Sequence, residues 1–367
     1  MFITFRADAS LQIGTGHIMR CLTLADALKV AGAKCRFICR AHPGHLLNLI
    51  RRRGHLAIGL PNVEQNIPTA NLNDETKLAH AMWLGADWRT DVAQAETAMK
   101  GQQTDWLIVD HYAIDARWES ALKRQYRKLM VIDDLADREH ICDVLLDQNL
   151  VEEMETRYRD QVPEHCTRLI GPQYALLRPE FNALRPASLA RREKPSLNRL
   201  LIFMGGSDAE NETSKAVDGV KLSKNCWQHI DVVVGENFPA LQALKESLAP
   251  LSSAMLHIQT PDMAKLMASA DLAVTAGGSV TWEKCALGLP SLVVILGENQ
   301  RPIATKMHER GAQRTMNLAP HHLTPACYAK YLNEFQANEL TAMSEAASAV
   351  CDGTGTAKVL KVLESHP

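Results

Sequence analysis

The stretch DLAVTAGGSVTWEKCALGLPSLVVIL, residues 271–296, contains one complete repeat of an α/β fold. An apolar run, 272–275, leads into the pair Gly277-Gly278, which is followed by a helical stretch, 280–287, and a second apolar run, 291–295. Apolar runs rich in Val, Ile and Leu on either side of a helix are typical of parallel strands covered on both faces. The segment therefore predicts a doubly wound parallel sheet.

The same plan of strand, turn and helix recurs in both halves of the chain. We therefore expect an α/β fold of two Rossmann-like doubly wound domains that face each other across a cleft, with ligands at the carboxyl ends of the strands. The strands are expected at 1–5, 34–39, 106–109, 129–132, 144–146, 199–203, 230–234, 255–258, 272–275 and 291–295, and the helices at 18–30, 45–53, 240–248, 263–268, 280–287, 302–309, 340–351 and 357–363.

A domain boundary is predicted at RPASLARREKPS, residues 185–196, which is charged, contains two prolines and has no clear strand pattern. Such a stretch is typical of a linker. It gives an N-terminal domain, 1–185, and a C-terminal, nucleotide-binding domain, 197–367. Segments 59–76 and the tail after residue 323 are the least informative.

Composition excludes several classes of protein. The formal charge of −2 and an aromatic content of 5% argue against a nucleic-acid binder. Nine irregularly spaced cysteines fit reduced core thiols better than disulfides or zinc ligands. The N-terminus lacks a charged leader before an apolar run, and no apolar run approaches the ~20 residues of a spanning helix. We expect a cytoplasmic protein without a membrane partner, either a monomer or a weak oligomer.

The first candidate site is Gly14-Thr15-Gly16-His17, which follows the opening strand and precedes a helix. The two glycines allow a tight turn and a close approach to ligand. The positive field at a helix start should keep the imidazole of His17 neutral and able to accept a proton. A structural histidine is the alternative, but its position in the predicted cleft favours function.

Two further glycine turns predict a nucleotide site in the second half. Gly205, Gly206 and Ser207 follow a strand and suit a pyrophosphate, although Asp208 could instead cap the next helix. Gly278 and Ser279 begin another helix and suit a phosphate, and Glu283 lies one turn further on. A carboxylate there can accept both hydroxyls of a ribose, as acidic residues do in nucleotide-binding folds.

Polar residues follow three other strands. Asn299 and Gln300 can hydrogen-bond a sugar, with helix capping as the alternative. In Asp110-His111-Tyr112, capping and packing are as plausible as substrate contact. The pair Asp133-Asp134 suggests magnesium, but neighbouring residues on a strand point to opposite faces, so we expect no metal.

Six motifs in order resemble one family: FRADASLQIGTGHIMR, IVDHYAID, IDDLADREHICDVLLDQN, GPQYALLRPEF, FMGGSDAEN and AGGSVTWEKCALGLPSLVVILGENQ. They are similar to the UDP-2,4-diacetamido-2,4,6-trideoxy-β-L-altropyranose hydrolases of pseudaminic acid biosynthesis, over residues 1 to about 317. The resemblance implies the GT-B fold, shared with the MurG glycosyltransferases. It implies His17 as the catalytic residue, Tyr112 and Asn299 as substrate contacts, and Gly278, Ser279 and Glu283 as the nucleotide site. Residues 52–84 and the C-terminal helices match nothing in the family.

The implied reaction is attack of water on the anomeric carbon of a UDP-sugar, with UDP as the leaving group and no cofactor. His17 would activate the water, and the loops of the second domain would hold the diphosphate. Two alternatives remain, a UDP-sugar glycosyltransferase on the same fold and a nucleotide-sugar sensor without catalysis. Fold analogy alone does not separate the three.

Overall fold

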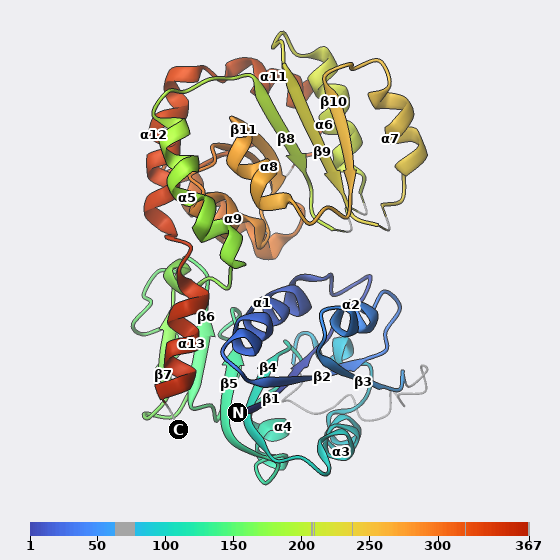
Figure 1. Ribbon diagram of the computed structural model, residues 1–367, viewed down its shortest axis with the longest axis vertical. Helices are drawn as coiled ribbons and strands as arrows, with labels where there is room; N and C mark the ends of the chain where they lie inside the picture. Colours follow the sequence, from blue (N-terminus) through green and yellow to red (C-terminus); the bar gives the residue numbers. More distant parts are fainter. Residues whose placement is uncertain (63–77, 207, 209, 237, 320, 366–367) are drawn as a thin grey trace. The chain divides into compact units, whose positions relative to one another are not determined.

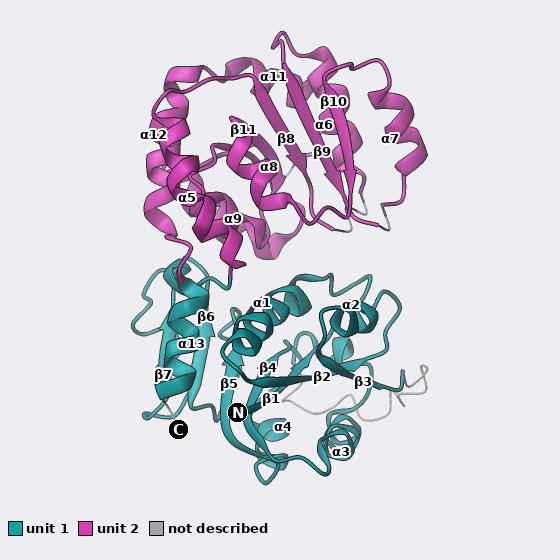
Figure 2. Cartoon of the chain, viewed as in Figure 1, with its two compact units in different colours: residues 1–176, 355–367 teal, residues 177–354 magenta. Residues whose placement is uncertain are grey.

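The computed structural model describes residues 1–62, 78–206, 208, 210–236, 238–319 and 321–365. The chain forms two compact units, each built on a parallel sheet (Figure 2). Unit 1 comprises residues 1–176 and 355–367, and unit 2 comprises residues 177–354.

The sheet of unit 1 has seven parallel strands in the order β3-β2-β1-β4-β5-β6-β7 (Figure 1). Its side chains alternate between two cores: Trp106 and Ile108 of one strand join the first core, whereas Leu107 and Val109 join the second. The strands are β1 (Phe2–Ala7), β2 (Lys34–Arg40), β3 (Leu56–Leu60), β4 (Thr104–Asp110), β5 (Tyr126–Ile132), β6 (Val144–Asp147) and β7 (Thr167–Ile170).

Helices cover both faces of this sheet. The first core takes apolar residues from α1, α2 and α13, and the second from α3 and α4. The helical elements of unit 1 are α1 (Gly16–Val30), α2 (Leu47–Arg52), η2 (Ala81–Leu84), α3 (Trp88–Met99), α4 (Ala116–Ala121), η3 (Pro172–Tyr174) and α13 (Gly355–Ser365).

Unit 2 repeats the plan with six parallel strands in the order β10-β9-β8-β11-β12-β13. Its strands are β8 (Arg199–Phe203), β9 (His229–Val234), β10 (Ala254–Ile258), β11 (Leu272–Ala276), β12 (Ser291–Val294) and β13 (Arg314–Thr315). Its helical elements are α5 (Pro179–Arg192), α6 (Glu212–Leu222), α7 (Leu241–Leu248), α8 (Met263–Ser269), α9 (Val280–Ala286), η4 (Glu298–Gln300), α10 (Arg301–Glu309), α11 (Pro325–Glu334), α12 (Ala337–Val350).

All ten expected strands and eight expected helices are confirmed within a few residues at their ends. The strands β3, β7 and β13 were not predicted; they are five, four and two residues long, and β13 has no apolar residue. The helices α3, α4, α5, α6 and α11 were also not predicted.

The predicted linker 185–196 is wrong, because most of it belongs to α5. Two of its arginines, Arg185 and Arg192, hydrogen-bond main-chain carbonyls and are not solvated charges. Arg185 donates to the carbonyls of Ala286, Ser348 and Cys351. Arg192 is 7% exposed and donates to main-chain carbonyls around α8. The stretch 185–196 is therefore part of unit 2, and the boundary between the units falls at residue 177.

The last helix also departs from the predicted division, which assigned it to the C-terminal domain. Val359 and Leu363 of α13 are buried in the first core of unit 1, and Figure 1 shows the helix beside β6 and β7. At its start, a Cβ on Gly355 would lie 2.3 Å from the carbonyl oxygen of Ala175, so only glycine fits. An amphipathic helix thus completes the cover of a sheet formed by residues far earlier in the chain.

Candidate functional site

The turn before α1 is open on its outer side, as the glycine pattern predicts. Gly14 has φ of +81°, a left-handed conformation that favours glycine, and its N–H donates to Ser10 O at 2.9 Å. A Cβ on either Gly14 or Gly16 would meet no atom within 4 Å. The helix begins at Gly16, which places His17 in its first turn at 8% exposure.

His17 pairs with a buried carboxylate that the sequence did not single out as its partner. Nδ1 of His17 lies 2.6 Å from Oδ1 of Asp110, the last residue of β4. Arg20, one turn along α1, donates to both oxygens of Asp110 at 2.6 Å. Burial alone would raise the pKa of Asp110, but the charges and hydrogen bonds of Arg20 and His17 hold it well below its ordinary value.

This ion pair fixes the tautomer of the histidine. An ionised Asp110 has no proton to give, so the short contact requires Nδ1–H of His17 as the donor. A neutral ring with a proton on Nδ1 has its lone pair on Nε2. Nδ1 also lies 3.3 Å from Arg20 Nη2, which is farther than Asp110. Because Arg20 Nη2 donates to Asp110, this second contact does not change the assignment. Nε2 of His17 is therefore the atom that can accept a proton.

Tyr112 closes the cluster from the other side. Its ring meets the ring of His17 edge-on, with centroids 4.7 Å apart and planes at 84°. Its hydroxyl donates to Asp134 Oδ1 at 2.5 Å, and Asp134 also pairs with Arg20 at 3.3 Å. Burial and the nearby Asp134 raise the pKa of Tyr112 far above its ordinary value, so it stays a neutral donor. The structure thus brings together His17 and Tyr112, two residues that the sequence placed in one site.

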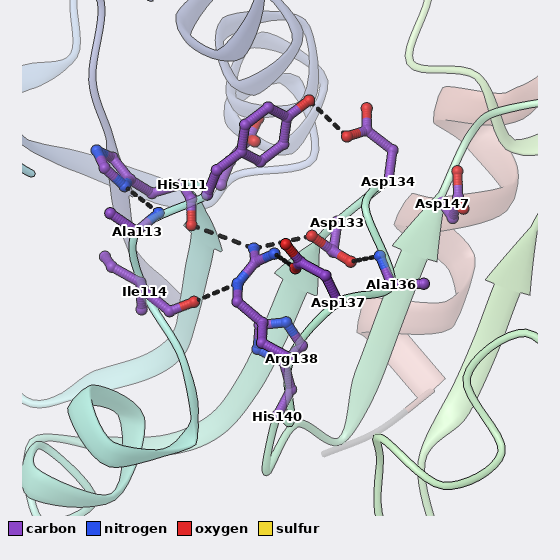
Figure 3. Close-up of polar contacts among 12 residues, drawn as sticks. His111, Ala113, Ile114, Asp133, Asp134, Ala136, Asp137, Arg138, His140 and Asp147 are labelled. Carbon is purple, nitrogen blue, oxygen red and sulfur yellow. Dashed lines mark hydrogen bonds and ion pairs between the residues drawn. The ribbon is translucent and has the colours of Figure 1, made fainter. Parts of the chain in front are cut away.

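The carboxylates of Asp133 and Asp134 have separate partners (Figure 3). Asp133 pairs with Arg138 at 2.8 Å and accepts from the N–H of Ala136 at 2.9 Å. Asp134 lies toward Tyr112 instead. Within the described residues, no three or more His, Cys, Asp or Glu side chains are grouped to hold a metal ion. The magnesium alternative for this pair therefore has no support from its geometry.

In unit 2, the turn after β8 is a tight strand-to-helix connection. Gly205 has φ of +99°, and a Cβ on Gly235 would lie 1.9 Å from the carbonyl oxygen of Gly206. Asp208 accepts from the N–H groups of Glu212 and Thr213, both at 2.9 Å. Asp208 thus satisfies two N–H groups at the start of α6, although the N-cap residue of the helix is Asn211. Ser207 lies outside the described residues.

The turn after β11 is braced by a residue that the sequence placed among the sugar contacts. Cβ atoms on Gly277 and Gly278 would lie 3.3 and 3.9 Å from the amide of Gln300. Gln300 also accepts from the N–H of Leu296 at 3.1 Å. Ser279 is exposed and makes no side-chain cap to α9. Gln300 therefore supports the turn.

Glu283 lies on α9, one turn beyond Ser279, and it is half-buried. Burial raises its pKa to about 7, with Arg178 partly offsetting the effect and Glu180 adding to it. The described residues provide no hydrogen bond to this carboxylate. A carboxylate with a raised pKa and no fixed partner is a candidate for a ligand contact.

A pocket of about 250 Å³ lies at the carboxyl end of β12. It is next to the exposed Asn299 on η4, but Asn299 does not line it. His321 and His322, which no sequence pattern singled out, do line the pocket. The pocket is lined by Glu210, Glu212, Val294, Ile295, Leu296, Gly297, Glu298, Arg301, Asn317, His321, His322 and Leu323.

The predicted residues fall into two groups, one in each unit. His17, Gly14, Gly16 and Tyr112 lie in unit 1, and the remainder lie in unit 2. Asp110 and Arg20 were missed as partners of His17, and Asp134 as the partner of Tyr112. The spacing of Arg20, three residues after His17 and hence on the same helical face, was the one available signal. In the described part of the chain, no helix is both long and apolar enough to cross a membrane.

Comparison with known proteins confirms the resemblance. Residues 200–360 match the glycosyltransferase family 28 C-terminal domain. The UDP-2,4-diacetamido-2,4,6-trideoxy-β-L-altropyranose hydrolase of Campylobacter jejuni is 25% identical over 312 residues, which is 85% of this chain and 97% of that protein. An uncharacterized protein of Methanocaldococcus jannaschii is 24% identical over 305 residues, 82% of this chain. The chain spans only 57% of that archaeal relative.

The fold also has solved relatives. MurG of Acinetobacter baumannii superposes with a TM-score of 0.66 at 15% identity, and the match covers 99% of each chain. With its two parallel-sheet units, the chain has the GT-B fold, as predicted.

Proposed function

We propose that the protein is a hydrolase of a UDP-linked 2,4-diacetamido-2,4,6-trideoxyhexose of the altropyranose type. Water is the second substrate, and the products are UDP and the free sugar. Similarity to the Campylobacter hydrolase over nearly its whole length supports an enzyme that processes a sugar nucleotide. The family 28 match and the MurG-like fold support the same class.

One observation carries the proposal, the pairing of His17 Nδ1 with an ionised Asp110 at 2.6 Å. It leaves Nε2 of His17 as a base, in the arrangement by which a carboxylate orients histidine in acid–base catalysis. A nucleotide-sugar sensor would not require a base held beside the open turn of Gly14 and Gly16. The geometry therefore favours catalysis over a nucleotide-sugar sensor.

In the proposed reaction, Nε2 of His17 accepts a proton from water while the water oxygen bonds to the anomeric carbon. The bond from that carbon to the diphosphate oxygen breaks, and its electron pair leaves with UDP. The imidazolium that forms is stabilised by Asp110 and then releases its proton to solvent. Tyr112, a neutral donor beside the ring, is placed to hydrogen-bond the sugar if it exchanges its bond to Asp134.

UDP is proposed to bind unit 2, at the two glycine turns and Glu283. Backbone N–H groups of Gly205, Gly206 and Gly278 and the hydroxyls of Ser207 and Ser279 would hold the diphosphate. Glu283 would accept the ribose hydroxyls, and Asn299 would contact the sugar. Gln300 would act by holding the second turn in shape. The reaction so written uses no metal and no cofactor.

The test is incubation of the UDP-sugar with enzyme and water alone. A hydrolase releases UDP and free sugar in equal amounts without an acceptor. A glycosyltransferase on the same fold would release neither at a comparable rate until an acceptor is added, and a sensor would bind and release the sugar nucleotide intact. Either of these two results would overturn the proposal.

A further inference from the structure

Two aromatic side chains from the segment that matches no family motif lie against the catalytic cluster. The ring of Trp83, in η2, stacks on Tyr112 with centroids 5.6 Å apart and planes at 26°. The ring of His80 lies 5.3 Å from Tyr112 and 4.5 Å from Trp83. Since Tyr112 also meets His17 at 4.7 Å, these rings form a continuous aromatic surface that ends at the proposed base. We call His80 and Trp83 the aromatic wall.

The main chain holds this wall in place. Gly85, directly after η2, has φ of +66°, and a Cβ there would lie 2.5 Å from His42 and 2.8 Å from Arg40. Leu84 is 2% exposed within the second core of unit 1. Asp87 then caps α3 by accepting from the N–H groups of Arg89 and Thr90. The wall is therefore carried by a short helix fixed at its end to the sheet and to α3.

The wall is also partly open, unlike most indole rings in the chain. Trp83 is half-buried, whereas Trp106, Trp118, Trp227 and Trp282 are at most 7% exposed and belong to the interior. A large aromatic ring that keeps an accessible part next to a catalytic group is suited to a ligand contact. Its indole N–H can also donate to an amide carbonyl.

We propose that Trp83 and His80 form a subsite for the sugar of the sugar nucleotide, a proposal that rests on the function proposed above. A deoxy sugar with acetamido groups presents C–H and methyl surfaces that pack on aromatic faces. Neither wall residue carries a fixed positive charge, so the wall suits the uncharged sugar and not the diphosphate. The wall would hold the sugar with its anomeric carbon toward His17 and select against sugars with hydroxyls on that face.

The kinetic test compares Trp83→Ala and Trp83→Phe with a matched control, Trp88→Ala. Trp88 is the other half-buried tryptophan of unit 1, stacked by Arg89 outside the wall. Trp83→Ala should raise KM for the UDP-sugar roughly tenfold, the scale of one aromatic contact plus its buried area. UDP inhibition should stay within about twofold of wild type, and Trp83→Phe should recover most of the loss. Equal effects on UDP and UDP-sugar, or a normal KM in Trp83→Ala with an unchanged melting temperature, would contradict the subsite.

A binding test separates this proposal from the hydrolase proposal, because it needs no turnover. Tryptophan fluorescence is measured for His17→Asn enzyme with and without Trp83→Phe, titrated with UDP, UDP-sugar and free sugar. The expected result is a change with UDP-sugar that Trp83→Phe abolishes and that UDP alone does not produce. A Trp83-dependent change with UDP alone would assign the wall to the uracil ring and overturn the sugar subsite. If wild-type enzyme releases no UDP but the Trp83-dependent change is seen, the subsite stands and the hydrolase proposal fails.

Discussion

Arg20 contacts both oxygens of Asp110 at 2.6 Å, and through this ion pair it determines which nitrogen of His17 carries the proton. A lone histidine at a helix start can be protonated on either nitrogen. Here a carboxylate that stays ionised allows only one neutral form, with Nε2 unprotonated. The chemistry proposed for His17 therefore depends on a pair of residues that need not touch the substrate.

Asp110→Asn should remove most activity while the fold is kept. The asparagine amide can donate to Nδ1, which would move the ring proton to Nε2 and abolish the base. We expect kcat to fall by roughly 10³–10⁴-fold, the scale seen when a histidine is forced into the wrong tautomer. Steady-state release of UDP measures kcat, and calorimetry with UDP should show unchanged affinity. Asp105→Asn, on the same strand and bonded to the N–H of Phe2, is the control. A mutant with near-normal kcat would show that the dyad is structural.

His17→Asn and His17→Gln test the base itself. Because a residue that acts in the transition state lowers kcat, both should reduce turnover by about 10²–10⁴-fold with little change in UDP affinity. If His17→Gln retains near-normal kcat, His17 only hydrogen-bonds the substrate.

Glu283 predicts a pH dependence of UDP binding. Burial raises its pKa to about 7 in the free protein, so it is mostly protonated at pH 6 and mostly ionised at pH 8. A ribose hydroxyl donates best to the ionised form, and UDP affinity should therefore rise from pH 6 to pH 8 with release of a proton on binding. Glu283→Ala should weaken binding by roughly 1.5–3 kcal/mol at pH 8. Calorimetry in buffers of different ionisation enthalpy measures both the UDP affinity and the proton release. An unchanged affinity in Glu283→Ala would exclude the ribose contact.

The same shift has a consequence for stability that calorimetric melting can check. A carboxyl whose pKa rises on folding binds its proton more tightly in the native state. The stabilisation of the native state by this bound proton is fully present below about pH 4.5, and it is lost as the pH rises through about 7. Glu283→Gln, which carries no charge, should raise the melting temperature at pH 8 relative to wild type and leave it nearly equal at pH 4.5. An equal difference at both pH values would contradict the shift.

Activity should survive an excess of chelator. The carboxylates near His17 are paired with Arg20 and Arg138, and the described residues offer no cluster with metal-ligand spacing. EDTA should therefore leave UDP release unchanged within experimental error. Loss of activity that magnesium restores would overturn the proposed mechanism and would favour Asp133 and Asp134 as magnesium ligands.

Local pattern predicted the framework of the fold but not its long-range connections. The ten predicted strands are short apolar runs, and His17 lies where a strand meets a glycine turn. The contact between His17 and Asp110 joins residues 93 positions apart, and it follows from the adjacency of β1 and β4, which no local pattern contains. Helix α5 was predicted as a linker for a similar reason. Its arginines suggested a solvated segment, whereas the carbonyls that Arg185 binds come from distant parts of the chain.

Helix α13 has a consequence for how the chain folds as it is synthesised. Unit 2 is formed by one continuous stretch, 177–354, so it can complete its core as soon as that stretch has left the ribosome. Unit 1 begins first, but Val359 and Leu363 of its first core are made only after unit 2. Until then the apolar face of its sheet that receives them stays uncovered. Unit 1, although it begins first, is thus completed after unit 2, and its uncovered apolar face is open to aggregation until α13 docks.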